Sequence, residues 1–294
     1  MGIFVEGKQG RTEVTSTVSG GSIGGLLEFQ KEVLTPAENR IGRMAVVLGE
    51  NFNTQFAQGW DIDGNQGDPN FFTVDAPQST VMSGNSTVTA TFSDVGQLES
   101  SDYQMKYDGA NWSLTRMSDG QSVSMTGSGT SGDPFIGDGL SIVTAGSAAN
   151  GDTILIEPYR DTAAKFVTNV TDPRKVAASM SDPAVDPGAT GDNRNMLALF
   201  GLQESRMFDN GTVSFDGAYS QLVAEVGTKA SMAQTMLDSR TIIYEHAVGA
   251  REEYSGVNLD EEAANLLQFQ QAYTAAAKVM SVADEIFKSL VNIT

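Results

Sequence analysis

The chain has 294 residues, enough for one large or two ordinary domains with a sizeable core. Its 37 acidic and 18 basic residues give a formal net charge of -19, and such a surface repels nucleic acid and anionic lipid, so we expect no nucleic-acid partner. The absence of cysteine excludes disulfides, thiol nucleophiles and thiolate metal sites, and no stretch approaches the ~20 apolar residues of a membrane span, so we expect no membrane insertion.

The first 24 residues predict a short β segment. Ile3 to Val5 and Thr12 to Val18 have the composition of strands around a Gly-Lys-Gln-Gly turn. The opening residues lack the charged start and long apolar run of a cleaved signal peptide, so we expect none.

One long helix is predicted from about 25 to 57. Apolar residues recur at spacings of three and four on both sides of Pro36, which should kink or briefly interrupt the helix. Because the apolar face is narrow, the helix should belong to a bundle. The residues of this face are Leu26, Leu27, Phe29, Val33, Leu34, Ile41, Met44, Leu48, Phe52 and Phe56.

An antiparallel β domain is predicted from roughly 60 to 165. Apolar and threonine residues alternate over 87–92, as expected for a strand with one buried face. Tyr103 to Tyr107 and Trp112 to Thr115 flank Asp108-Gly109, which predicts a hairpin. A second turn at Asp119-Gly120 should lead into Val123 to Met125, and further strands are predicted over 140–143 and 153–156.

An extended return segment and three helices should follow. Three prolines fall within 171–191, and no proline occurs after Pro187. Asp192 can cap a helix over 193–202. A second helix, about 214–254, would span about 60 Å and end at Ser255-Gly256. Its apolar residues are Leu222, Val226, Ala233, Met236, Ile243 and Ala247.

The last stretch, 257–294, contains neither glycine nor proline and carries a heptad seam. Asn258 can cap its start with Glu261 as the reciprocal partner, and the acidic residues 260–262 suit the positive end of the helix dipole. An apolar stripe on a terminal helix needs a partner helix, in this chain or another. We select Leu259, Leu266, Phe269, Tyr273, Met280, Phe287 and Leu290 as the predicted assembly face.

The predicted fold is α+β: a bundle of long helices with an inserted antiparallel β-rich domain. The helical part would comprise 25–57 and 192–256, and the outer β-rich part with its return segment 58–191. Residues 1–24 would lie at the edge of the helical part, and 257–294 would form the assembly helix.

Candidate chemistry is sparse. His246 is the single histidine, and no Gly-x-Ser-x-Gly elbow accompanies it, so an ordinary helix-surface residue is favoured over a catalytic one. Residues 127–132 match a G-x-G-x-x-G pattern, but Asp133-Pro134 follows instead of a helix, which favours a loop. Residues 61–68 resemble a calcium loop, but Phe72 stands where the bidentate glutamate belongs. We expect no enzyme activity, cofactor or metal.

Several segments resemble bacterial flagellar axial proteins, and among them the hook-associated protein 1 family. The segment 258–273 is similar to the C-terminal helix that axial proteins share. Residues 20–27 and 51–61 are similar to hook-associated protein 1, and so is Gly191-Asp192-Asn193-Arg194-Asn195, the most discriminating run. The resemblance covers nearly the whole chain as the C-terminal half of that family. The N-terminal helix that pairs with the terminal helix in the family has no counterpart, so we expect a fragment.

The resemblance implies a structural subunit that forms a ring at the junction between hook and filament. Its implied partners are further copies of itself, the hook protein, the next junction protein and a flagellar export chaperone that binds the C-terminal helix. It also implies export through the flagellar apparatus, without a cleaved signal, to the extracellular flagellum.

Two alternatives remain open at this stage. One is another axial protein, such as the hook protein, against which the segment 191–199 argues. The other is a secreted carbohydrate-binding or hydrolytic β domain with Trp60 and Trp112 as sugar platforms, although Trp112 on an alternating strand is more simply a core residue.

Overall fold

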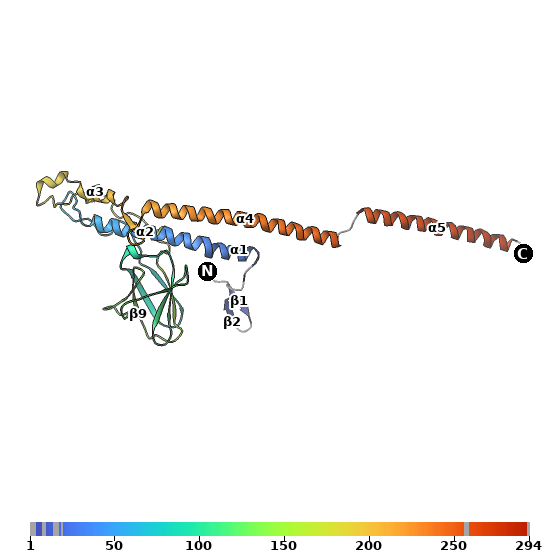
Figure 1. Ribbon diagram of the computed structural model, residues 1–294, viewed down its shortest axis with the longest axis horizontal. Coiled ribbons are helices and arrows are strands. Elements are labelled where there is room, and N and C mark those ends of the chain that lie inside the picture. The colour runs from blue at the N-terminus through green and yellow to red at the C-terminus, as the bar shows by residue number, and fades with distance from the viewer. Residues whose placement is uncertain (1–3, 8–9, 14–17, 19, 256–258, 293–294) are drawn as a thin grey trace. The chain divides into compact units, whose positions relative to one another are not determined.

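The computed structural model describes residues 4–7, 10–13, 18, 20–255 and 259–292. The chain divides into two compact units, Met1–Lys229 and Ala230–Thr294. The fold is α+β, with long helices and inserted antiparallel sheets (Figure 1). No helix within the described residues is both long and apolar enough to cross a membrane.

The chain opens with a hairpin of β1 (Phe4–Gly7) and β2 (Gly10–Glu13), in which Phe4 is paired with Glu13. The two strands overlap the strands predicted at Ile3 to Val5 and Thr12 to Val18. Residues 8–9 of the predicted turn and residues 14–17 of the predicted second strand lie outside the described residues.

The predicted helix from 25 to 57 begins earlier and has three parts. These are α1 (Gly21–Phe29), the π-helical segment η2 (Gln30–Leu34) and α2 (Thr35–Phe56). Pro36 lies in the first turn of α2, where its missing N–H costs least. The interruption expected at Pro36 is therefore a π-helical turn just before it.

The β-rich part is a sandwich of two antiparallel sheets. One sheet has the order β3-β10-β5-β6-β7 and the other β4-β9-β8. The predicted hairpin is confirmed, because β5 and β6 pair with Tyr107 opposite Trp112 and Asp108 accepts hydrogen bonds from the amides of Ala110 and Asn111. The strands are β3 (Gln78–Ser83), β4 (Thr87–Phe92), β5 (Tyr103–Tyr107), β6 (Trp112–Arg116), β7 (Ser122–Val123), β8 (Phe135–Gly137), β9 (Leu140–Ala145) and β10 (Thr153–Glu157).

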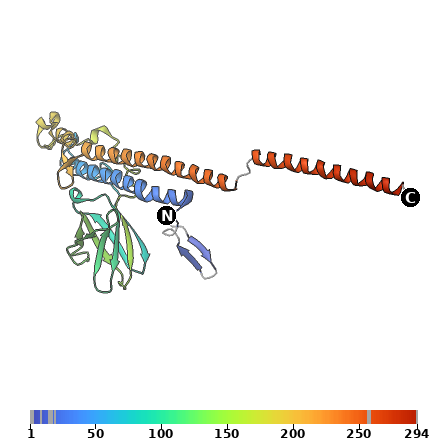
Figure 2. The ribbon, with the colours of Figure 1, turned by 45° about the vertical axis from the view of Figure 1, so that its right-hand side comes forward.

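Alternate residues of these strands face one shared core. Ala90 on β4, Ile142 on β9 and Ile154 on β10 are each at most 1% exposed. Val46 and Val47 of α2 belong to the same cluster, so α2 packs against the sandwich (Figure 2). The alternation of apolar and polar residues, from which the strands were predicted, therefore identifies the inner faces of the two sheets, where they pack against each other.

α2 approaches the β-rich part closely because it carries a glycine at the contact. A Cβ at Gly42 would lie 2.5 Å from Cβ of Tyr159 and 2.8 Å from its carbonyl oxygen. Further along α2, the Asn53 amide group donates to the carbonyl of Phe72 and accepts from its amide, at 2.9 and 2.8 Å. Phe52, Phe56, Phe71, Phe72 and Phe166 form a chain of ring contacts beside this bond.

A 3-10 turn, η3 (Val95–Gln97), lies between β4 and β5. After β10, the proline-containing return segment has two further 3-10 turns, η4 (Pro173–Lys175) and η5 (Pro187–Gly191). The helix α3 (Arg194–Gly201) and a small hairpin of β11 (Arg206–Phe208) and β12 (Val213–Ser214) follow. The two long helices expected from the sequence are α4 (Phe215–Ser255) and α5 (Leu259–Val291) (Figure 1).

Candidate assembly surface

The predicted assembly face lies on α5, and its described side chains are exposed. From Asp260 to Asn292 every side chain is exposed. Leu259 is the first residue of α5, but its side chain lies outside the part that the structure describes. The other six have exposed fractions from 62% to 78%: Leu266, Phe269, Tyr273, Met280, Phe287 and Leu290. Because monomeric proteins rarely expose contiguous apolar patches of this size, these side chains are a candidate interaction surface.

The apolar face of α5 is wider than the sequence prediction. Val279 and Ile286 are 69% and 57% exposed, and each directly precedes a seam residue, Met280 or Phe287. They occupy the heptad position that borders the seam. The sequence prediction considered two positions per heptad, and including this third position would have found both residues. Three apolar positions per heptad are typical of a helix that packs against more than one neighbour, whereas a two-stranded coiled coil needs only two.

Charged side chains at both ends of α5 stabilise the helix through local interactions. Asp260, Glu261 and Glu262 lie in its first turn and Lys288 in its last, so each end carries the charge that the helix dipole favours. Lys288 also pairs with Asp284 at 2.7 Å across one turn, an exposed pair worth about 0.3–0.5 kcal/mol. The predicted cap at Asn258 lies outside the described residues.

The predicted stripe on α4 is buried only near the start of the helix. Leu222 is 6% exposed, whereas Val226, Met236 and Ile243 are 39%, 53% and 67% exposed. Further apolar side chains are exposed around the helix, namely Met232, Leu237, Ile242 and Tyr244. Much of α4 therefore offers apolar surface on several sides, which the single predicted stripe underestimated.

The Gly-Asp-Asn-Arg-Asn run has a structural role that begins with Asp192. Its carboxylate accepts hydrogen bonds from the amides of Arg194 and Met180, both at 3.0 Å, and from the Ser179 hydroxyl at 3.1 Å. The Arg194 guanidinium donates to the same carboxylate, and these bonds hold the pKa of Asp192 well below its usual range. The N-cap residue of α3 is Asn193, one residue after the predicted Asp192, but Asp192 still accepts from the first helical amide and ties the return segment to α3.

Asn195 completes this junction and is fully buried. Its Nδ2 donates to the carbonyl oxygen of Ala177 at 2.6 Å, and its Oδ1 accepts from Nε2 of Gln55 on α2 at 2.8 Å. A Cβ at Gly59 would lie 2.0 Å from Nδ2 of Asn195, so only glycine fits beside it. One side chain therefore joins α2, the return segment and α3.

The other candidate sites from the sequence have ordinary structural explanations. His246 is an exposed residue of α4. Oδ1 of Asp61 accepts from the amides of Asp63 and Asn65, and the Asp63 carboxylate pairs with Arg174. Among the described residues, no group of three or more His, Cys, Asp or Glu could hold a metal ion.

The glycine-rich run and the tryptophans likewise fit the fold. Residues 127–132 form a turn before β8, with the Thr130 amide donating to the carbonyl of Asp133, and no helix follows. Trp112 is half-buried on β6 and contacts the Tyr107 ring at 5.1 Å. Trp60 is half-buried, and its backbone exchanges hydrogen bonds with Ser179 at 2.8 and 3.2 Å. Neither ring is an open sugar platform.

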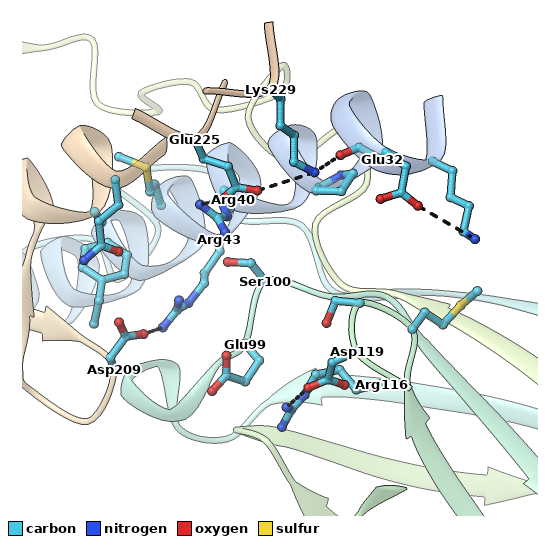
Figure 3. Close-up of a pocket in the computed structure, with 18 residues that line it drawn as sticks. Glu32, Arg40, Arg43, Glu99, Ser100, Arg116, Asp119, Asp209, Glu225 and Lys229 are labelled. Atoms are coloured by element: carbon cyan, nitrogen blue, oxygen red, sulfur yellow. Dashed lines mark hydrogen bonds and ion pairs between the residues drawn. The ribbon is translucent and has the colours of Figure 1, made fainter. Parts of the chain in front are cut away.

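A cavity of about 460 Å³ lies between α2, the start of α4 and the end of β6 (Figure 3). Its charged lining has five basic and five acidic side chains, and all of them except Glu99 form ion pairs with one another, so the lining does not present one sign of charge to a ligand. Arg43 donates to Asp209 at 2.7 Å and Arg116 to Asp119 at 2.9 Å, and Arg40 pairs with Glu225. The charged lining residues are Lys31, Arg40, Arg43, Arg116, Lys229, Glu32, Glu99, Asp119, Asp209 and Glu225.

Three family models match different parts of the chain. The model described as "Flagellar hook-associated protein FlgK helical domain" matches residues 1–72, and "Flagellar hook-associated protein 1, D2-like domain" matches 78–158. Residues 249–293 match "Flagellar basal body rod FlgEFG protein C-terminal". The terminal helix is therefore of a kind found in rod proteins, whereas the rest distinguishes the chain from the hook-type alternative.

Similar proteins extend along almost all of the chain. Flagellar hook-associated protein 1 of Escherichia coli (strain K12) is 32% identical, over 99% of this chain and 52% of that protein. The Salmonella typhimurium protein of the same name is 33% identical, over 99% and 53%. The chain thus spans about half the length of these relatives.

One solved structure shares the fold. The flagellar hook junction protein FlgK from Burkholderia pseudomallei aligns with a TM-score of 0.73 at 21% identity, over 82% of this chain and 64% of that one. Since the hook-associated models and the relatives agree along nearly its whole length, the chain belongs to the flagellar hook-associated protein 1 family.

Proposed function

We propose that this chain is a structural subunit of the bacterial flagellum that joins hook to filament by self-assembly. The observation that carries the proposal is the row of exposed apolar side chains on α5, 62% to 78% exposed over about seven turns of helix with no cover among the described residues. A mechanical adaptor needs such a contact surface and no reactive site. The identity with flagellar hook-associated protein 1 of Escherichia coli and Salmonella typhimurium supports the hook-associated assignment.

The free energy available from this face is large enough for assembly. Burying one large apolar side chain contributes roughly 1.5–3 kcal/mol, so the six described seam residues offer roughly 9–18 kcal/mol before the costs of association. The same contact repeated head to tail between identical subunits closes a ring when its rotation permits. The wide face of α5 suits a tube wall, in which a helix has several neighbours.

The proposal also assigns partners and place. Identical copies of this protein would form the ring, with the hook protein on one side and the next junction protein on the other. Before export, a flagellar chaperone would cover α5 by binding it in a groove, since an exposed amphipathic helix is the usual ligand of such a groove. The site of action would be the extracellular flagellum, reached through the flagellar export apparatus without a cleaved signal peptide.

Each part of the chain would have its own role in such a subunit. Residues 25–57 and 192–256 would supply the helical part, with 1–24 at its edge. Residues 58–191 would supply the outward-facing β-rich part with its return segment, and 257–294 the assembly helix.

The experiment adds charge to the seam of the protein as the bacterium makes it. We expect Leu266→Glu with Phe287→Glu to abolish both filament growth on the hook and chaperone binding, because each buries a carboxylate in an apolar contact. Gln271→Glu with Ser281→Glu is the matched control, since it adds the same charge on the opposite side of α5. Normal filaments from the seam variant would show that the assigned face is wrong.

A further inference from the structure

The joint between α1 and α2 lacks a regular helical hydrogen bond. In an α-helix the carbonyl of Glu32 accepts from the amide of residue 36, but that residue is proline, which has no N–H. The chain passes this point as the π-helical segment η2, whose last bond runs from the Thr35 amide to the Gln30 carbonyl. Backbone irregularities of this kind are common where a helix bends.

A side chain from α4 fills the missing position. Nζ of Lys229 donates a hydrogen bond to the carbonyl oxygen of Glu32 (Figure 3). Glu225, one turn earlier on α4, lies 3.8 Å from the same ammonium and pairs with Arg40 of α2. The ammonium therefore bonds to the joint itself and to a carboxylate of α4 that also pairs with α2.

Little else fixes the direction of α1. Gly24 is its single buried residue, whereas Ile23, Leu26 and Phe29 are 57%, 68% and 52% exposed. By contrast, α2 buries nine residues against the rest of its unit. The direction of α1 thus depends on the joint more than on packing of its own side chains.

We propose that η2 is a hinge between α1 and α2, and that Lys229 of α4 locks it by donating to the Glu32 carbonyl, which Pro36 leaves without its helical partner. The lock sets where the apolar face of α1 points. Ser22 lies ten residues before Glu32, so it is about 15 Å from the hinge, and a 20° swing would move it by about 5 Å.

The experiment measures the position of α1 relative to α4 in the full chain. Because the sequence has no cysteine, Ser22→Cys and Ser220→Cys can carry two spin labels, and pulsed electron resonance gives their distance distribution. Both serines are exposed. We expect Lys229→Met to broaden the distribution at least twofold. Lys31→Met, which removes an exposed cation from the residue next to Glu32, should leave it unchanged, since the ion pair given for Lys31 is with the Glu32 carboxylate, at 3.9 Å, and not with the carbonyl.

A second background isolates the carbonyl bond from general effects of losing a charge. Pro36→Ala restores the amide that Glu32 would use in a regular helix, so in that background Lys229→Met should no longer broaden the distribution. Equal broadening with and without the proline would overturn the proposal, because it would show that Lys229 acts without regard to the missing amide. A distribution that Lys229→Met leaves unchanged in the wild-type background would overturn it as well.

Discussion

Replacing Asn195 with alanine should loosen the junction between α2, the return segment and α3. The change removes two hydrogen bonds, to the Ala177 carbonyl at 2.6 Å and from the Gln55 amide at 2.8 Å. A buried group left without a partner costs about 1–3 kcal/mol. Ala177 is fully buried, so leaving its carbonyl without a donor should cost close to the upper end of this range. Gln55 is partly exposed, so its side-chain amide can bond to water instead. We therefore expect a loss of about 3 kcal/mol.

The assay is urea unfolding followed by Trp60 fluorescence. The chain has two tryptophans, so Trp112→Phe leaves Trp60 as the single reporter, and its backbone pairs with Ser179 in the same return segment. With a urea dependence of about 2–3 kcal/mol per M, the midpoint should fall by about 1 M.

The matched control for this variant is Asn193→Ala. Asn193 belongs to the same sequence run, but its side chain is exposed and makes no capping bond to α3. Its midpoint should match the parent chain within about 0.2 M, the shift that a surface change of about 0.5 kcal/mol produces. If Asn195→Ala and Asn193→Ala have the same midpoint, the buried network does not stabilise this junction and our reasoning is refuted.

Two further predictions concern the contact of α2 with the β-rich part. Gly42→Ala should destabilise the chain by about 1–3 kcal/mol in thermal unfolding, because its Cβ would overlap Tyr159, whereas Gly25→Ala, which meets no atom within 4 Å, should not destabilise it. Burial raises the pKa of the Asp102 carboxyl to about 6 despite a hydrogen bond from Asn39, so the folded state binds more protons than the unfolded state between about pH 4 and 6. The free energy of unfolding should therefore fall by about 2 kcal/mol as the pH rises through that window, and Asp102→Asn should flatten this dependence; an unchanged slope would contradict the assignment.

Much of the fold is predictable because its signals are local. The hairpin of β5 and β6 follows from alternation around Asp108-Gly109, and α5 follows from a long run without glycine or proline. β3 is missed because it is an edge strand whose second half is exposed on both faces, which removes the alternation. β8 and β11 have three residues each, too few for a pattern.

The parts that escape prediction depend on residues distant in the sequence. Pro36 signals an interruption, but the donor that serves the Glu32 carbonyl is 197 residues away. Asn195 reads as a polar residue at a helix start, and its burial becomes evident only with Gln55, 140 residues earlier, in place. The seam on α5 is predictable from spacing, whereas what covers it depends on another helix.

The central claim is that the apolar face of α5 is built to be covered by other helices in an assembly. Hydrogen exchange of the α5 amides, measured in dilute monomer and in the assembled state, tests this most directly. We predict weak protection between Leu266 and Leu290 in the monomer and an increase of at least a hundredfold on assembly, because an isolated helix is marginal in water. Strong protection of these amides in the dilute monomer would contradict the claim.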